Sequence, residues 1–175
     1  MMHVRCPVGL PEEGYHRVLE VLDGFSPVVQ VIPPGAALVE LRGAVGYLGM
    51  DECGIAGVVR LRSVALLGVD LRIGIGTSWT VAATASGRVT GPGGVLAVSP
   101  ESTEEWLATL PVEALHGIGP QHAATLRRYG IDTVALLAAL PAGTVQRVPG
   151  PGGPPPSGRA AGTSDPSPPE PSQYP

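Results

Sequence analysis

Short apolar stretches alternate with amphipathic helical patterns over the first 100 residues, and this alternation limits the possible folds more than any other feature. Between Glu12 and Asp23, for example, Tyr15, Val18 and Leu22 recur at helical spacing, which predicts a helix with one buried stripe. The elements expected in chain order are a strand at 1–5, a helix at 12–23, strands at 28–32 and 37–42, a helix at 51–67, a strand at 71–75, a helix at 80–85 and a strand at 95–98. This order predicts an α+β fold with a mixed or antiparallel sheet and helices on one face.

From Ser102 the pattern becomes helical, and its centre is the hairpin motif His116-Gly117-Ile118-Gly119 in front of a helix at 120–129. Two glycines allow a tight turn that exposes backbone N–H groups, and the positive end of the next helix points to the same place. A DNA phosphate fits there without any base contact. The residues expected to contact DNA through this helix-hairpin-helix are Gly117, Ile118, Gly119, Gln121, Arg127 and Arg128. Alternatively, the hairpin is a tight connection between packed helices that serves only the fold.

The charge of the chain limits how strongly it can bind nucleic acid. The formal net charge is −4, and every basic residue is Arg because the chain contains no Lys. Phosphate contacts need Lys or Arg, so we expect any DNA contact to be local, weak and independent of base sequence.

The two cysteines and the hydropathy of the chain point to its environment. Cys6 and Cys53 lie far apart and form no pair with zinc-binding spacing. We find no signal peptide and no apolar run that could span a bilayer. The chain is therefore expected to be cytoplasmic, without a membrane partner.

Composition divides the chain into three parts. We expect an α+β domain at 1–100 and a small helical domain at 101–148. Residues 149–175 are rich in Pro and Gly and nearly free of aromatic residues, a composition that predicts a disordered tail.

Several segments together resemble the Y-family (UmuC/DinB-like) translesion DNA polymerases. "LPVEALHGIGPQHAATLRRYGIDTVALLAAL" is similar to the palm–thumb junction and the thumb of that family, and "VDLRIGIGTSWTVAATAS" is similar to a strand–turn–helix of its palm. "FSPVVQVIPPGAALVELRG" is similar to the stretch that contains an Asp-Glu pair in the family. The resemblance implies a partial polymerase palm followed by a helix-hairpin-helix thumb, with the fingers absent from 1–100 and no little finger.

The same resemblance implies a catalytic site that this chain does not preserve. Family members hold two Mg²⁺ ions with carboxylates on palm strands. Here those acid positions fall on Arg5, Pro7, Gly35 and Ala36. Neither metal is expected to bind, and no catalytic residue is assigned. Glu40 is the nearest remaining acid, at a position the family does not use for catalysis.

These observations favour a non-catalytic relative of translesion polymerases. The resemblance implies a role in DNA repair and the damage-induced SOS response, with an active translesion polymerase or a sliding clamp as a possible partner. Two alternatives stay open. The chain could be a working DNA-directed nucleotidyltransferase with an unusual metal site, or a degenerate remnant without a function.

Overall fold

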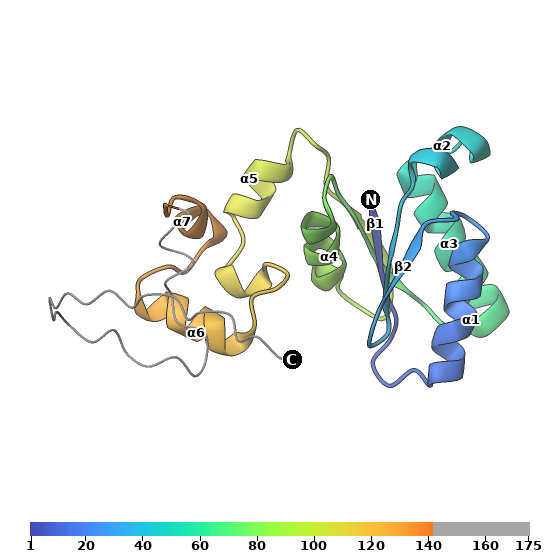
Figure 1. The fold of residues 1–175 in the computed structure, drawn as a ribbon, viewed down its shortest axis with the longest axis horizontal. Helices are drawn as coiled ribbons and strands as arrows, with labels where there is room; N and C mark the ends of the chain where they lie inside the picture. Colours follow the sequence, from blue (N-terminus) through green and yellow to red (C-terminus); the bar gives the residue numbers. More distant parts are fainter. Residues whose placement is uncertain (142–175) are drawn as a thin grey trace, which may run out of the picture.

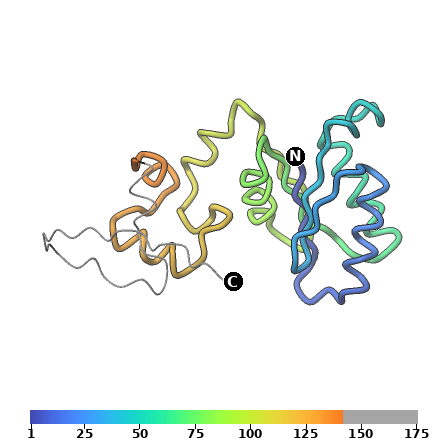
Figure 2. The backbone as a smooth tube through the Cα atoms, in the orientation of Figure 1, coloured from blue at the N-terminus to red at the C-terminus, as the bar shows by residue number. Residues whose placement is uncertain are grey.

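The fold is known from a computed structural model that describes residues 1–141. The tail expected at 149–175 and the last residues of the expected helical domain lie outside that range. Five strands form one sheet with the spatial order β2-β3-β1-β4-β5, and the helical C-terminal part lies to one side of it (Figures 1 and 2). The strands are β1 (Met2–Arg5), β2 (Val29–Ile32), β3 (Ala36–Val39), β4 (Arg72–Ile75) and β5 (Gly94–Ala97).

The sheet is mixed, as the sequence predicts. β1 is central and pairs antiparallel with both β3 and β4, while β4 and β5 pair in parallel. The register places Arg5 opposite Ala36 on one side and opposite Arg72 on the other. The end of β1 therefore lies between residues that are distant in the sequence.

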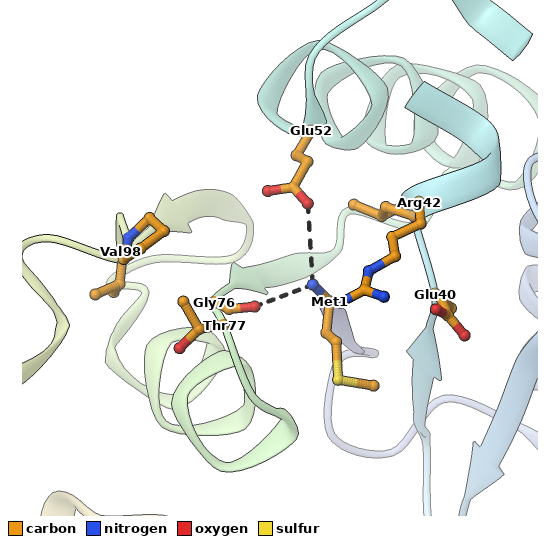
Figure 3. A pocket seen from close by; sticks show the side chains of 9 residues that line it. Met1, Glu40, Arg42, Glu52, Gly76, Thr77 and Val98 are labelled. Carbon is orange, nitrogen blue, oxygen red and sulfur yellow. Dashed lines mark hydrogen bonds and ion pairs between the residues drawn. The ribbon is translucent and has the colours of Figure 1, made fainter. Parts of the chain in front are cut away.

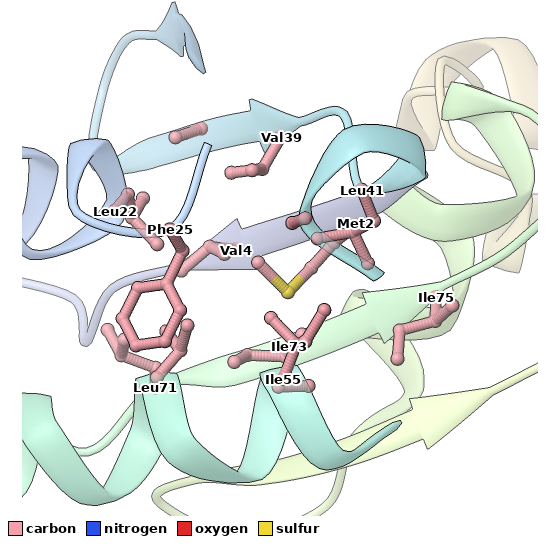
Figure 4. Close-up of a cluster of buried hydrophobic side chains, with 14 of the residues drawn as sticks. Met2, Val4, Leu22, Phe25, Val39, Leu41, Ile55, Leu71, Ile73 and Ile75 are labelled. Carbon is pink, nitrogen blue, oxygen red and sulfur yellow. The ribbon is translucent and has the colours of Figure 1, made fainter. Parts of the chain in front are cut away.

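The main hydrophobic core lies between one face of the sheet and two helices, α1 (Glu12–Asp23) and α3 (Glu52–Leu67) (Figure 4). Met2 and Val4 point into it from β1, and Leu22 and Ile55 meet them from the two helices. Each of these side chains is at most 1% exposed. Burying one such side chain contributes about 1.5–3 kcal/mol, so this layer contributes strongly to the stability of the sheet.

A third helix, α4 (Trp79–Arg88), covers the other face of the sheet and packs on β4 and β1. The helices therefore lie on both faces, rather than on the one face that the pattern of elements predicts. Small residues make this second layer possible. Gly74 of β4 lies so close to α4 that an added Cβ atom would be 2.0 Å from the carbonyl oxygen of Ala82.

Local signals explain both ends of α3. The side chain of Asp51 accepts a hydrogen bond of 2.7 Å from the N–H of Gly54 and caps α3. Gly68 ends α3 in the left-handed conformation. The short helix α2 (Arg42–Leu48) was not expected from the sequence, because it contains two glycines and no side-chain cap marks its start.

The C-terminal part consists of α5 (Thr103–Ala108), the 3₁₀ helix η1 (Val112–Ala114), α6 (Pro120–Arg128) and α7 (Val134–Ala138). Val112, Ala123, Leu126 and Ile131 form a small core of its own. Within residues 1–141, none of the helices has the length and apolar character needed to cross a membrane.

Candidate functional site

The four residues at the expected acid positions lie together at one end of the sheet. Arg5 faces Ala36 across the β1–β3 pair, and the N–H of Cys6 donates a hydrogen bond of 2.8 Å to the carbonyl oxygen of Gly35. Arg5, Pro7, Gly35 and Ala36 all line one cavity of about 390 Å³. The fold thus brings together four residues that come from two separate segments of the sequence.

The chemistry of this end of the sheet does not fit a magnesium site. Mg²⁺ prefers carboxylate and other oxygen ligands in a near-octahedral arrangement, whereas Arg5 provides a positive charge and Pro7 and Ala36 have no side-chain donor. Burial raises the pKa of the Cys6 thiol to about 11, so the sulfur is protonated at neutral pH. No carboxylate lines this cavity in the described part of the chain.

Two histidines lie beside this cavity. His3 is buried on β1, and its Nδ1 is 2.7 Å from the hydroxyl of Ser86 on α4. Burial first, and then the nearby charge of Arg5, lower the pKa of His3 to about 4. The same two causes lower the pKa of His116. Both rings are therefore neutral at pH 7. Sequence reasoning missed His3, although its place two residues before Arg5 in a strand puts both on one face.

His116 connects the hairpin to the sheet layer. Its backbone N–H donates a hydrogen bond of 3.0 Å to the hydroxyl of Thr84 on α4. Its ring and the ring of Trp79 pack in a T-shaped arrangement with 4.7 Å between the ring centroids. Trp79 is 43% exposed, so its ring is in part a surface group that covers this junction.

The hairpin between η1 and α6 has the geometry that its two glycines suggest. Gly117 adopts a φ of 94°, which favours glycine, and Gly119 is the N-cap of α6. Open space surrounds the position of a Cβ atom at both glycines. Ile118 packs against the small helical core.

The other residues expected at the DNA contact are divided between the two ends of α6. Gln121 lies in the first turn beside the hairpin, whereas Arg127 and Arg128 end the helix, about 9–11 Å from Gln121 along its axis. Arg127 forms an ion pair with Glu113, and Arg128 is exposed. Only the hairpin and Gln121 can therefore meet the same phosphate.

Acidic residues gather at the opposite end of the sheet (Figure 3). A cavity of about 460 Å³ is lined by Glu40, Glu52, Arg42 and Met1, among others. The Met1 amine donates a hydrogen bond of 3.0 Å to the carbonyl oxygen of Gly76 and lies 4.0 Å from the carboxylate of Glu52. Glu40 follows β3, whose other end begins at Ala36. Glu40 is therefore separated from Arg5 by the length of the strand.

Comparison with known proteins gives a consistent picture, although no family model matches the chain. The chain is 34% identical over 133 residues to DNA polymerase IV 2 of Mesorhizobium japonicum, a match that covers 76% of this chain and 32% of that protein. It is 33% identical over 121 residues to DNA polymerase IV of Halobacterium salinarum, covering 69% and 29% respectively. The chain thus spans about a third of the length of the curated relatives it matches.

Solved structures agree on the fold. The DinB protein of Sulfolobus solfataricus superposes with a TM-score of 0.69 at 16% identity, over 78% of this chain and 40% of that one. An insertion ternary complex of the polymerase Dbh superposes with a TM-score of 0.69 at 18% identity, also over 78% and 40%.

Proposed function

Because this chain belongs to the Y family of DNA polymerases, of which it contains part of the palm and the helical segment that follows, we propose that it is a non-catalytic member that binds DNA weakly. In this proposal, residues 1–100 are the palm-like domain and the segment from 101 is a thumb with a helix-hairpin-helix. The DNA contact is a phosphate held by the hairpin, and the setting is DNA repair or translesion synthesis.

The loss of catalysis is supported by one observation above all. The residues at the family's acid positions meet at one end of the sheet, and they are Arg5, Pro7, Gly35 and Ala36. A guanidinium repels a divalent cation, by about 1 kcal/mol per unit charge at 4 Å in water and by more where water is excluded. Glu40 cannot compensate, because it follows the opposite end of β3.

DNA binding is supported by the backbone of the hairpin. Within residues 1–141, the N–H groups of Gly117 and Gly119 donate no hydrogen bond. The first N–H groups of α6 also lack intrahelical partners, and the helix adds its partial positive charge at the same point. These donors match a phosphate oxygen and would contact DNA of any sequence.

The binding is proposed to be weak because the charges around the hairpin nearly cancel. Between Pro111 and Pro141 the two arginines are balanced by Glu113 and Asp132, and Arg127 is already paired with Glu113. We therefore expect a Kd on the order of 10⁻⁴ to 10⁻⁶ M at physiological salt, as for non-specific binding.

The test is a titration of a labelled DNA duplex with the full chain, followed by fluorescence anisotropy at two salt concentrations. Gly119→Leu places a side chain over the hairpin amides. The extended backbone and the open surroundings of position 119 leave room for that side chain. We expect affinity to fall at least fivefold. Gly57→Leu, at an exposed position of α3 with equally open surroundings, is the control and should bind like the parent chain. Equal binding by both variants would show that the hairpin is only structural.

The proposed role is that of an adaptor, because a palm without its metal ligands can still contact DNA and proteins. We propose an active translesion polymerase or a sliding clamp as the protein partner. Affinity purification of the tagged chain from cells with damaged DNA should recover one of these proteins above the level from undamaged cells. Recovery of neither would remove the adaptor role while leaving the DNA contact untouched.

A further inference from the structure

Three arginines surround the junction between the sheet, α4 and the hairpin. Arg5 ends β1, Arg72 lies directly opposite it at the start of β4, and Arg88 ends α4. Because directly opposed residues of an antiparallel pair point to the same face, with their Cβ atoms about 5 Å apart, Arg5 and Arg72 share the face covered by α4. A Cβ atom at Gly87 would lie 4.0 Å from Nη2 of Arg5, so this guanidinium reaches the C-terminal end of α4.

This cluster has no counter-ion among residues 1–141. None of the three arginines forms an ion pair there. Glu113 is the one carboxylate that lines the cavity at this junction, and it is engaged by Arg127. The C-terminal end of α4 offsets part of the charge, but a helix end provides only about half an elementary charge. The negative charge available near the three arginines is therefore far smaller than their total positive charge.

Two further observations indicate that an acceptor is missing. The Nε atom of Arg72 is buried and makes no hydrogen bond with any described residue, which leaves a charged donor without a partner. In addition, Arg5 and Arg72 are like charges directly opposite each other in the sheet, an arrangement that destabilises the pair. A bound anion beside Arg5 would offset the repulsion between the two arginines.

The cavity at this junction is large enough for such a ligand. It has a volume of about 410 Å³ and is lined by Arg5, Arg88, His116 and the hairpin glycine Gly117, among others. Arg5 and His116 also line the neighbouring cavity of about 390 Å³. Sites for small ligands in proteins measure about 300–1,000 Å³, so a phosphate group with an attached sugar or a second phosphate fits.

We propose that this junction is a phosphate-binding site in which the guanidinium groups of Arg5 and Arg88 hold the ligand, with Arg72 adding to the positive potential. Guanidinium groups match phosphate oxygens in two-point hydrogen bonds. The ligand is a phosphate group, either of a nucleic-acid strand or of a free nucleotide or pyrophosphate. The site is separate from the proposed hairpin contact, because its ligands are side chains and not backbone amides.

The experiment measures binding of pyrophosphate and, separately, of a single-stranded oligonucleotide to the full chain by isothermal titration calorimetry at low salt. Arg5→Gln removes the central charge, and Arg88→Gln does so at an exposed position where the fold is not at risk. Arg17→Gln, on the exposed face of α1, is the control for a general loss of charge. We expect at least one probe to bind with a stoichiometry of one. Arg5→Gln and Arg88→Gln should each weaken this binding at least tenfold, whereas Arg17→Gln should weaken it less than twofold.

The two probes identify the source of the phosphate. If both variants weaken the binding of the oligonucleotide, the ligand is a nucleic-acid strand. If they weaken only the binding of pyrophosphate, the ligand is a small molecule. Equal binding by Arg5→Gln, Arg88→Gln and Arg17→Gln, or no binding of either probe, would overturn the site. Gly119→Leu separates this result from the hairpin proposal, because it blocks the amides without changing any of the three arginines.

An NMR titration of the ring of His116 gives an independent readout. Arg5 contributes to the lowered pKa of this histidine, so neutralising that charge with a bound phosphate should raise the pKa. An unchanged pKa in the presence of saturating pyrophosphate would contradict a ligand at this junction.

Discussion

Replacing Gly74 with alanine tests the close contact between β4 and α4 on which the site depends. The added Cβ atom would lie 2.0 Å from the carbonyl oxygen of Ala82 and 2.3 Å from the backbone nitrogen of Ser86. Ordinary carbon–oxygen contacts are about 3.3–3.6 Å. Both neighbours are backbone atoms within a helix, so no side chain can rotate out of the way. Instead, α4 must move away from the sheet by roughly 1 Å.

The cost of that movement follows from what α4 buries. Its residues Val81, Ala82 and Ala85 are at most 5% exposed, and a gap of 0.5–1 Å already removes a quarter to a half of each van der Waals contact. The hydrogen bond of 2.7 Å between His3 and Ser86 would also lengthen. Overpacking a core costs about 1–3 kcal/mol, and a backbone clash belongs at the upper end. We therefore expect Gly74→Ala to lower the free energy of unfolding by about 3 kcal/mol.

Urea unfolding at pH 7, followed by far-ultraviolet circular dichroism, measures this change. A loss of about 3 kcal/mol also lowers the Tm by on the order of 10 °C for a chain of this size. Gly57→Ala is the matched control, because position 57 lies within α3, is exposed and has nothing within 4 Å of its Cβ position. It should stabilise the chain by about 0.5–1 kcal/mol. If Gly74→Ala unfolds within 1 kcal/mol of the parent chain, the described packing of α4 is wrong.

Three further changes probe other parts of the fold. Because the pKa of His3 is about 4, well below its ordinary value of 6.5, the unfolded chain binds more protons as the pH falls. The free energy of unfolding should therefore drop by about 3 kcal/mol between pH 6.5 and 4, and His3→Gln should remove this component in urea titrations at both pH values. Ala123→Leu should destabilise the helical part by about 1–3 kcal/mol in thermal unfolding because position 123 is 2% exposed, whereas Ala124→Leu at an exposed position should change little. Asp70→Asn weakens a two-point contact with Arg60 of 2.8 and 2.9 Å; we expect a loss of about 1 kcal/mol, to be measured by urea unfolding, and no loss would show that this half-buried pair is not stabilising.

Local patterns in the sequence predict most of the elements but not their arrangement. The spacing of Val18 and Leu22 and the cap at Asp51 are properties of neighbouring residues, so the helices at 12–23 and 52–67 follow from them. The second helical layer depends instead on Gly74, whose missing side chain matters only because α4 lies against it. A glycine in a strand does not reveal which element approaches it.

In the candidate site, too, the sequence indicates some of the residues but not the contacts that depend on the tertiary arrangement. The resemblance to the polymerase family selects positions 5, 7, 35 and 36, and in the structure these four residues line one cavity. It gave no indication of Arg72 beside Arg5, since strand pairing between residues far apart in the sequence sets that contact. It also missed the link from His116 to Thr84, which joins two parts of the chain that look independent in sequence.

The central question about this protein is whether its palm-like sheet can catalyse nucleotide addition. The decisive measurement is a primer-extension assay with the purified full chain, a primed DNA template, all four deoxynucleotides and Mg²⁺ or Mn²⁺. With Arg5, Pro7, Gly35 and Ala36 at the end of the sheet, we predict no extension above a control without protein. A metal-dependent primer-extension activity that copurifies with the chain would contradict this prediction, because it would require a metal site that these residues do not form.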